Sequence, residues 1–272
     1  MQHQEFAPPA ELRDFIKCFW YNSRNLGERP SSFEVMPDGY AEIVFHFGSG
    51  CSIATIGGEQ PLLSPCLMGL LNQPVLLTAK GRLEVIGIRC FPWTVFDLLG
   101  LPPGKDGGRI VEHPIARLQA GLTQRVRAGQ VAEALALVTQ YFLQARAQLP
   151  NDGLLARAGG AMQAARGTLP VSQVAAAAHA TVRTLERKFK HAAGYTVKDV
   201  SGLMRFEQVR NQLWRHPGAN LAGLAHELGY ADQAHLSREF KRYSGTTPAA
   251  FARKASAERW ADNTDFVAFV QA

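Results

Sequence analysis

Two short segments of the chain carry basic residues in the same order. They lie 51 positions apart, and residues 183–194 read RTLERKFKHAAG while 234–245 read AHLSREFKRYSG. Arginine presents a planar fork of donors that can bond two acceptors on guanine, whereas lysine meets a phosphate as a point charge. Recognition of nucleic acid is therefore the chemistry these residues could do. The positions that recur are Leu185 and Leu236, Arg187 and Arg238, Phe189 and Phe240, Lys190 and Lys241, and Gly194 and Gly245.

The spacing within each segment predicts an amphipathic helix. At 100° per residue, the leucine and the phenylalanine four positions later face one way, and the arginine between them faces largely the other. We expect the leucine and phenylalanine of each copy to be buried. The expected outward positions are Arg183, Thr184 and Arg187 in the first copy, and Ala234, His235 and Arg238 in the second.

A small apolar helix and a tight turn precede each copy. The first reads VSQVAAAAHA and the second LAGLAHELGY, and an expected N-cap, Thr181 or Asp232, stands four residues before the leucine. A short helix, a turn and a helix with a polar outer face are typical of a helix-turn-helix unit, whose second helix can enter the major groove. A paired-helix repeat with only a structural role is the alternative.

A long helix is expected between the two units. Residues 197–215 repeat apolar positions at helical spacing, and Thr196 with Asp199 resembles a capping box. A rigid connection could hold two recognition helices in successive major grooves, about 34 Å apart. Arg205 and Arg210 on this helix are expected to brace the units rather than touch bases.

The positive charge of the chain belongs to the same region. Residues 153–256 hold 15 Lys and Arg against 6 Asp and Glu, a balance of +9, whereas 1–152 balance at −1 and 257–272 at −2. A concentrated basic surface indicates a polyphosphate partner, with a solvated basic face as the alternative.

Residues 153–256 resemble the DNA-binding domain of the AraC/XylS family of bacterial transcription regulators. The resemblance lies in MRFEQVRNQL and in the closing pattern LAHELGYADQAHLSREFKRYSGTTPAAFAR. The chain departs from the family at His179, where glycine is usual, and histidine tolerates a left-handed backbone better than most residues. The resemblance implies base contacts from Arg183, Thr184, Glu186, Arg187, Gln233, Ala234, His235 and Arg238, and phosphate contacts from Thr181, Lys190, Lys241 and Arg242.

Two of these positions leave alternatives open. Glu186 could accept from a cytosine amino group or form a salt bridge with Arg183 or Lys190. Ala234 has no hydrogen-bonding group in its side chain, so a contact there would be with a thymine methyl.

The first half of the chain is expected to be β-rich to about residue 92 and helical afterwards. Residues 41–47 alternate, 83–91 and 74–79 are further strand candidates, and 130–149 read as a helix. The segments FAPPAELRDFIKCFWYN and MPDGYAEIVFHFG resemble an uncharacterised N-terminal domain of some AraC-type regulators, from which the chain departs at Trp93. In the wider family this part binds an effector or dimerises, commonly on a cupin-like barrel.

The expected fold class is therefore α+β, with a β-rich, cupin-like N-terminal domain followed by an all-α domain of two helix-turn-helix units. We expect a sensing or dimerisation domain over 1–149, a linker at 150–152, the DNA-binding domain over 153–256 and a tail over 257–272. The expected partners are double-stranded DNA, RNA polymerase, a small-molecule effector and a second copy of the chain.

Three residues are candidates for the effector site. Glu42 and His46 share a strand face opposite Ile43, Phe45 and Phe47, so they either line a cavity or face solvent at a strand edge. Arg89 either holds an anionic effector or pairs with Glu42 or Glu84. Asp38, in Pro-Asp-Gly, is expected first of all to form a turn.

Motifs of the common enzyme classes are missing from the sequence. It has no G-x-S-x-G, Walker loop, dinucleotide fingerprint or HExxH, and its four cysteines lack metal-binding spacing. We expect no catalytic residue, no metal, no cofactor and no membrane segment, and a cytoplasmic activator. The rival interpretations are a ligand-independent regulator whose first half only dimerises, and a chemical sensor that uses Cys18 or Cys90.

Overall fold

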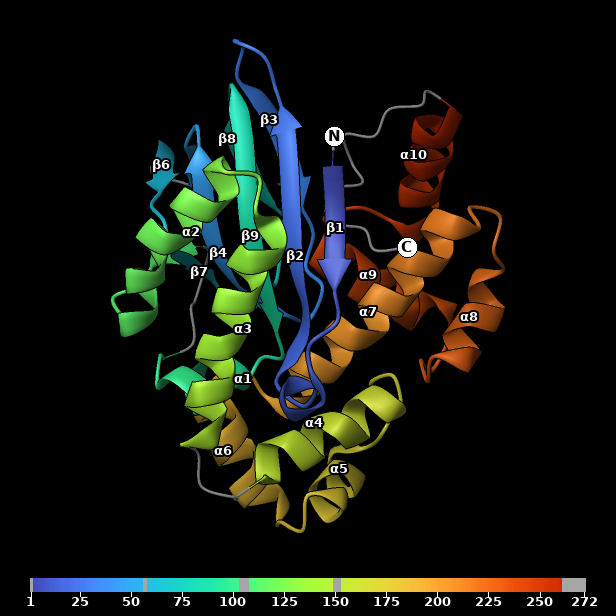
Figure 1. Ribbon diagram of the computed structural model, residues 1–272. Coiled ribbons are helices and arrows are strands. Elements are labelled where there is room, and N and C mark those ends of the chain that lie inside the picture. Colours follow the sequence, from blue (N-terminus) through green and yellow to red (C-terminus); the bar gives the residue numbers. More distant parts are fainter. Residues whose placement is uncertain (1, 56–57, 103–107, 149–152, 261–272) are drawn as a thin grey trace.

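The protein has an α+β fold in which two antiparallel sheets are followed by helices (Figure 1). The computed structural model describes residues 2–55, 58–102, 108–148 and 153–260. The expected linker at 150–152 and the expected tail from 261 onward lie outside the described residues.

The first sheet has six strands and carries the longest pairings. Its order is β1 (Gln2–Phe6), β2 (Ile16–Asn25), β9 (Arg82–Cys90), β4 (Ala41–Gly48), β7 (Cys66–Met68) and β10 (Gly108–Ile110). The second sheet has the order β3 (Ser31–Val35), β8 (Val75–Ala79), β5 (Cys51–Thr55) and β6 (Gly58–Leu62).

Both faces of the six-stranded sheet are covered. One face packs against the four-stranded sheet around Trp20, Val44 and Val85. The other packs against α1 (Thr94–Leu99), α2 (Leu118–Arg127) and α3 (Val131–Ala147). In Figure 1, α2 and α3 lie in front of the sheet and α1 lies at its lower end. Strand β4 therefore runs through the interior. The solvent-facing alternative for Glu42 and His46 is wrong, because the four-stranded sheet covers this face, on which Glu42 is buried and His46 half-buried.

The expected strands at 41–47, 74–79 and 83–91 are confirmed as β4, β8 and β9, and the helix expected at 130–149 is α3. The other strands of the described residues were not predicted, because several are polar or short and because the ten-residue β2 has an apolar run that does not alternate. β6, for example, reads GEQPL and exposes four of its five residues. Two 3-10 helices, Ala10–Leu12 and Pro114–Arg117, complete the described part of this half.

The second half consists of seven helices in the described residues after 153. They are α4 (Leu154–Ala164), α5 (Val171–Ala177), α6 (Val182–Ala193), α7 (Val197–Arg215), α8 (Leu221–Glu227), α9 (Gln233–Ser244) and α10 (Pro248–Trp260). The capping box of Thr196 and Asp199 is present at the start of α7. The hydroxyl of Thr247 accepts from the backbone N–H of Ala250 and caps α10. The long helix expected at 197–215 is thus confirmed.

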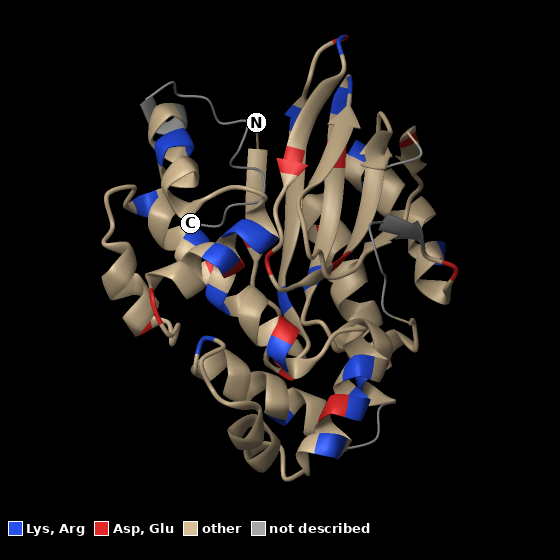
Figure 2. Ribbon diagram, turned by 180° about the vertical axis from the view of Figure 1, so that it is seen from behind, with Lys and Arg blue, Asp and Glu red and all other residues tan. Residues whose placement is uncertain are grey.

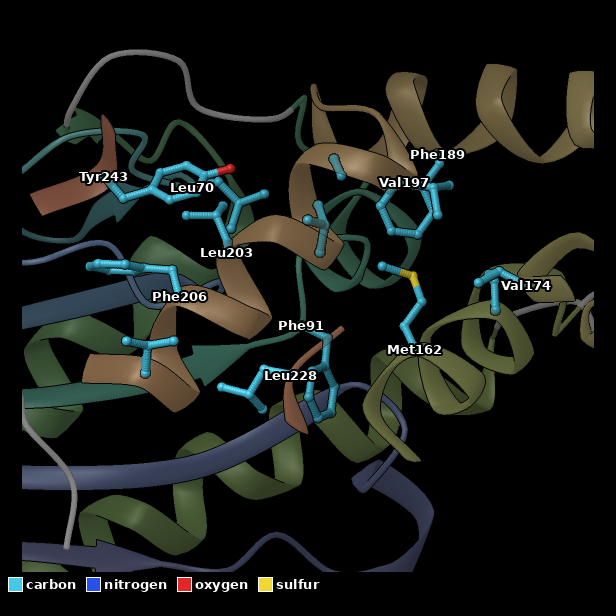
Figure 3. Packing of buried hydrophobic residues seen from close by; sticks show 14 of the residues in the cluster. Leu70, Phe91, Met162, Val174, Phe189, Val197, Leu203, Phe206, Leu228 and Tyr243 are labelled. Carbon is cyan, nitrogen blue, oxygen red and sulfur yellow. The ribbon is translucent and has the colours of Figure 1, made fainter. Parts of the chain in front are cut away.

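Trp93 joins the two halves of the molecule. Its side chain is fully buried, stacks on Phe91 with ring centres 5.5 Å apart, and contacts Phe189 of α6 with ring centres 5.6 Å apart. Phe91 and Leu70 from the first half pack in the same cluster as Phe189, Val197 and Leu203 (Figure 3). The departure from the N-terminal family at position 93 therefore lies at this junction.

Gly159 of α4 provides the space that Trp93 occupies. A Cβ at this position would lie 1.9 Å from the indole ring, whereas a Cβ at the adjacent Gly160 would meet nothing within 4 Å. The two glycines lie in the same helix and differ in this contact, so a substitution at Gly160 is the control for the same substitution at Gly159.

We expect Gly159→Ala to destabilise the protein on the order of 1–3 kcal/mol, because the indole or α4 must shift in a filled core. Gly160→Ala should instead stabilise it by about 0.5–1 kcal/mol, since alanine is the better helix former. Thermal and urea unfolding of both variants is the measurement. Equal effects of the two substitutions would contradict the packing described here.

Candidate functional site

The two recognition helices of the basic region, α6 and α9, are built alike. Thr181 caps α6 by accepting from the backbone N–H of Thr184, and Asp232 caps α9 by accepting from that of His235. Each helix ends at a glycine in the left-handed conformation. The inward residues are buried as predicted: Leu185, Phe189, Leu236 and Phe240 are at most 1% exposed.

The basic residues expected to meet DNA lie on the outer faces of these helices. Arg187 and Arg238 are exposed and form no ion pair with a described residue. Figure 2 shows Lys and Arg on both helices. Exposed with them are Thr181, Arg183, Lys190, Gln233, Ala234, Lys241 and Arg242, while Thr184 and His235 are half-buried.

Three of the expected contacts have partners inside the protein. The carboxylate of Glu186 accepts from the backbone N–H of Val197, at a distance of 3.3 Å, and so helps to cap α7. The sequence left open a cytosine amino group or a salt bridge with Arg183 or Lys190, and the backbone of Val197 is none of these. Arg242 lies 3.7 Å from the carboxylate of Asp199. The ring of His235 packs edge-on against Tyr230, with ring centres 5.3 Å apart.

The turns of the two units differ by one residue. His179 in the first turn and Gly229 in the second have φ angles of 52° and 69°. One residue separates His179 from its N-cap, whereas Tyr230 and Ala231 separate Gly229 from Asp232. The left-handed conformation expected for His179 is confirmed, and the extra residue places Tyr230 beside α9.

Arg205 ties the two units together across α7. Its guanidinium donates to both carboxylate oxygens of Glu239 on α9, at 3.0 and 3.1 Å, and to the backbone carbonyl of Gly167, at 2.9 Å. Glu239 precedes Phe240 of the recognition helix, while Gly167 follows α4. The bracing role expected for Arg205 is therefore present.

Arg210 connects α7 to the β-rich half instead of connecting the two helix-turn-helix units. Its guanidinium is 1% exposed and donates to the backbone carbonyl of Pro37, at 2.9 Å, in the loop before β4. Tyr195, between α6 and α7, likewise donates to the carbonyl of Leu70 at 3.0 Å. Both bonds join the basic region to the β-rich half.

A cavity of about 80 Å³ lies between the two sheets. Its wall is mostly apolar, and Trp20, Val44 and Leu77 come from three different strands. The candidate effector residues Glu42, His46 and Arg89 all line it, so the structure brings together the three residues that the sequence singled out. Asp38 lines it too.

Arg89 is paired with two carboxylates at the edge of this cavity. Its Nε donates to Glu42 at 2.7 Å, and its Nη2 lies 3.3 Å from the carboxylate of Asp38. Asp38 also accepts from the backbone N–H of Tyr40, which confirms the expected turn. Burial raises the pKa of Glu42, although Arg89 opposes that effect. Of the two carboxylates considered for Arg89, Glu42 is a partner, and Glu84 is instead bonded by Tyr21 and Arg82.

His46 and the cysteines are neutral groups in this half. Burial lowers the pKa of His46 to about 4, and its Nε2 lies 3.6 Å from Sγ of Cys66. Burial raises the pKa of Cys18 to about 12 and raises that of Cys90 as well. Among the described residues no group of three or more His, Cys, Asp or Glu could hold a metal ion. No described helix combines the length and apolarity that crossing a bilayer requires.

Comparisons with known proteins match both halves of the chain. Residues 4–111 match the model of a domain of unknown function, DUF6597, and residues 174–254 match that of a helix-turn-helix domain. No curated protein matches the chain significantly.

Solved structures also resemble the chain. ToxT from Vibrio cholerae O395 is 11% identical over 88% of this chain and 98% of that one, with a TM-score of 0.45. The fatty-acid-bound ToxT of Vibrio cholerae strain SCE256 is 10% identical over 86% of this chain and 94% of that one, with a TM-score of 0.44. The xylose-binding transcription activator XylR is 20% identical over 39% of this chain and 28% of that one, with a TM-score of 0.33.

The buried thiols lead to a prediction about reactivity. Because the thiolate is the reactive form, the raised pKa values of Cys18, Cys66 and Cys90 should make the folded protein react with a disulfide reagent more slowly than a cysteine peptide at pH 8. Unfolding in guanidinium should release all four thiols at the peptide rate. One thiol that reacts faster than the peptide in the folded state would restore the chemical-sensor interpretation.

Proposed function

We propose that this chain, which carries an AraC-type helix-turn-helix domain of a DNA-binding transcription regulator, reads two adjacent DNA elements and responds to a small effector. In this proposal α6 and α9 enter successive major grooves on one face of the duplex. The observation that carries it is the pair of capped helices, each with a buried Leu–Phe pair and an exposed arginine at the matching outward position.

The contacts around α7 support reading by both helices at once. Arg205 holds α7 to α9 and to the turn after α4, and Glu186 holds α6 to the start of α7. A rigid pair of helices loses little freedom when the second contact forms after the first. One chain can then read two elements without a partner copy.

The contacts that these residues make within the protein suggest different roles for the residues expected to contact DNA. Arg187 and Arg238 are the principal base readers in this proposal, with Arg183 and Gln233 beside them. Lys190 and Lys241 contact phosphates. Glu186 acts through α7 rather than on a base, because its carboxylate already accepts from a backbone N–H.

The first half acts as the sensor in this proposal, through the loop 36–40. Asp38 of this loop faces Arg89 in the cavity, while the carbonyl of the preceding Pro37 accepts from Arg210 of α7. A ligand that changes the pairing of Arg89 would therefore act on a segment bonded to the linking helix. The cavity favours this form over a purely dimerising first half. Activation through contact with RNA polymerase is the outcome that the family resemblance implies.

The two readers should lose different base positions. We expect Arg187→Ala to relax the preference at one short element and Arg238→Ala at a second, about one helical turn away, each at a cost of about 1–3 kcal/mol. Operator sequences are first selected from a random DNA pool, and binding isotherms and footprints of both variants then follow. Loss of the same base positions in both would leave only one unit as a reader.

Two controls belong to that experiment. Lys190→Ala should weaken binding to every sequence by a similar factor, as a phosphate contact does. An insertion of five base pairs between the elements turns them to opposite faces of the duplex, so affinity should fall to roughly that of one unit. An insertion without effect would contradict the two-groove arrangement.

The coupling between cavity and DNA-binding domain can be measured with a double-mutant cycle. We expect Asp38→Asn and Arg210→Lys to be non-additive in operator affinity by on the order of 0.5–2 kcal/mol, because both act on the segment 37–38. Asp38→Asn keeps the oxygen that accepts from Tyr40 but removes the charge facing Arg89. The exposed Gln212→Ala on the same helix is the matched control, and its effect should add to that of Asp38→Asn. Additivity of the first pair would separate the cavity from DNA binding.

A further inference from the structure

We propose that the cavity between the sheets takes a small apolar molecule with a basic amine, with Glu42 as the acceptor for its ammonium group, and that it rejects carboxylates. This inference rests on the proposed function, since it names the chemical class of the effector for the same site. It reverses the role that the sequence left open for Arg89 as a holder of an anion.

At the Arg89 end of the cavity the carboxyl groups outnumber the guanidinium groups by one. The guanidinium of Arg89 is already shared by the carboxylates of Glu42 and Asp38, at 2.7 and 3.3 Å. Side-chain exposures of 5%, 12% and 17% for Arg89, Glu42 and Asp38 keep water from screening the group. An anion entering here would meet two carboxylates and a neutralised arginine, whereas a cation would balance the charge.

Neighbouring charged groups do not supply that missing cation. Arg24 also lines the cavity, but it pairs with Leu83 on β9, six residues from Arg89. At about 3.3 Å per residue this separates the two arginines by roughly 20 Å along the strand. Arg210 is buried close enough to act on Asp38, but the carboxyl group of Glu207 lies 4.0 Å from it. With both included, three carboxyl groups still face two arginines.

The titration of Glu42 agrees with this arrangement. Burial raises the pKa of Glu42, because a buried site disfavours a bare carboxylate charge and so favours a proton on this group. An ammonium group bound there would take the place of that proton. Burial together with a charge partner is also the usual setting of a functional carboxylate.

The rest of the cavity sets the size and shape of the molecule. The volume is about 80 Å³. An engineered apolar cavity of roughly 150 Å³ binds benzene, so this smaller cavity fits a molecule with fewer carbon atoms, such as a propyl chain. Val44, Met68 and Leu77 supply the apolar wall. Trp20 lies against the sheet at Gly87, where a Cβ would stand 2.0 Å from its ring.

A second polar atom indicates that the cavity is built for an occupant. Nδ1 of His46 is buried and has no hydrogen-bond partner among the described residues, although His46 lines the cavity. A buried nitrogen without a partner destabilises the fold unless water or a ligand satisfies it. This nitrogen and the additional carboxyl group give one apolar cavity two polar points that an occupant could contact.

Three molecules of nearly equal shape test the proposal on the full-length wild-type protein. They are propylamine, 1-propanol and propanoate, titrated at pH 7 and followed by calorimetry and thermal shift. We expect the amine to bind at least about tenfold more tightly than the acid, with the alcohol in between. Tighter binding of the acid, or no binding of the amine, would overturn the proposal.

Glu42→Gln identifies the residue responsible. This substitution should reduce the preference for the amine over the alcohol to about onefold and leave the affinity for the alcohol unchanged. If Glu42→Gln does not fold, Asp38→Asn is the second variant, and it should reduce the same preference in part. A preference that survives in a folded Glu42→Gln protein would remove Glu42 from the site.

A second measurement distinguishes a wrong ligand class from failure of the proposed function. Binding to selected operator DNA is measured on the same preparation, without and with the amine. If the acid binds and the operator affinity changes with it, the effector role stands and the ligand class is wrong. If operator binding itself is absent, the proposed function fails whatever binds in the cavity.

Discussion

The burial of Trp93 between the β-rich half and the first helix-turn-helix unit is the contact on which the arrangement of the molecule depends. Its ring stacks on Phe91 at the end of β9 and meets Phe189 on the inner face of α6. The tryptophan that packs at the end of the sheet thus also fixes the recognition helix, since Phe189 lies on the face opposite Arg187. α4 can approach only because position 159 is glycine. Apolar packing, rather than a flexible connection, therefore sets the orientation of the first unit.

Hydrogen bonds connect this packed junction to the second helix-turn-helix unit and to the cavity. Arg205 bonds to Glu239 of α9, and Arg210 bonds to the loop that carries Asp38. Both arginines lie on α7, so one helix is bonded both to α9 and to the β-rich half. Buried guanidinium groups of this kind are sensitive to loss of a partner, because an unpaired buried charge is costly.

The charge of the cavity could not be read from the spacing of residues. The alternation of β4 placed Glu42 and His46 on one face, and that much is confirmed. The burial of this face depended on the second sheet, whose strands carry weak signals in the sequence. Asp38 and Arg89 lie 51 positions apart in sequence yet 3.3 Å apart in space. The excess of carboxylates appears only when the loop 36–40 folds against the strand.

The sequence by itself determined the local features of the DNA-binding half. Caps at Thr181, Thr196 and Asp232, the buried leucines and phenylalanines, and the left-handed His179 all follow from interactions within about five residues, which periodicity and capping chemistry describe. The tertiary structure decided what depends on distant contacts. Glu186 turned to the start of α7 instead of a basic neighbour, Arg210 turned to Pro37, and Trp93 found a glycine in another helix. These outcomes depend on which surfaces meet, and a pattern along one segment carries no information about the segment that packs against it.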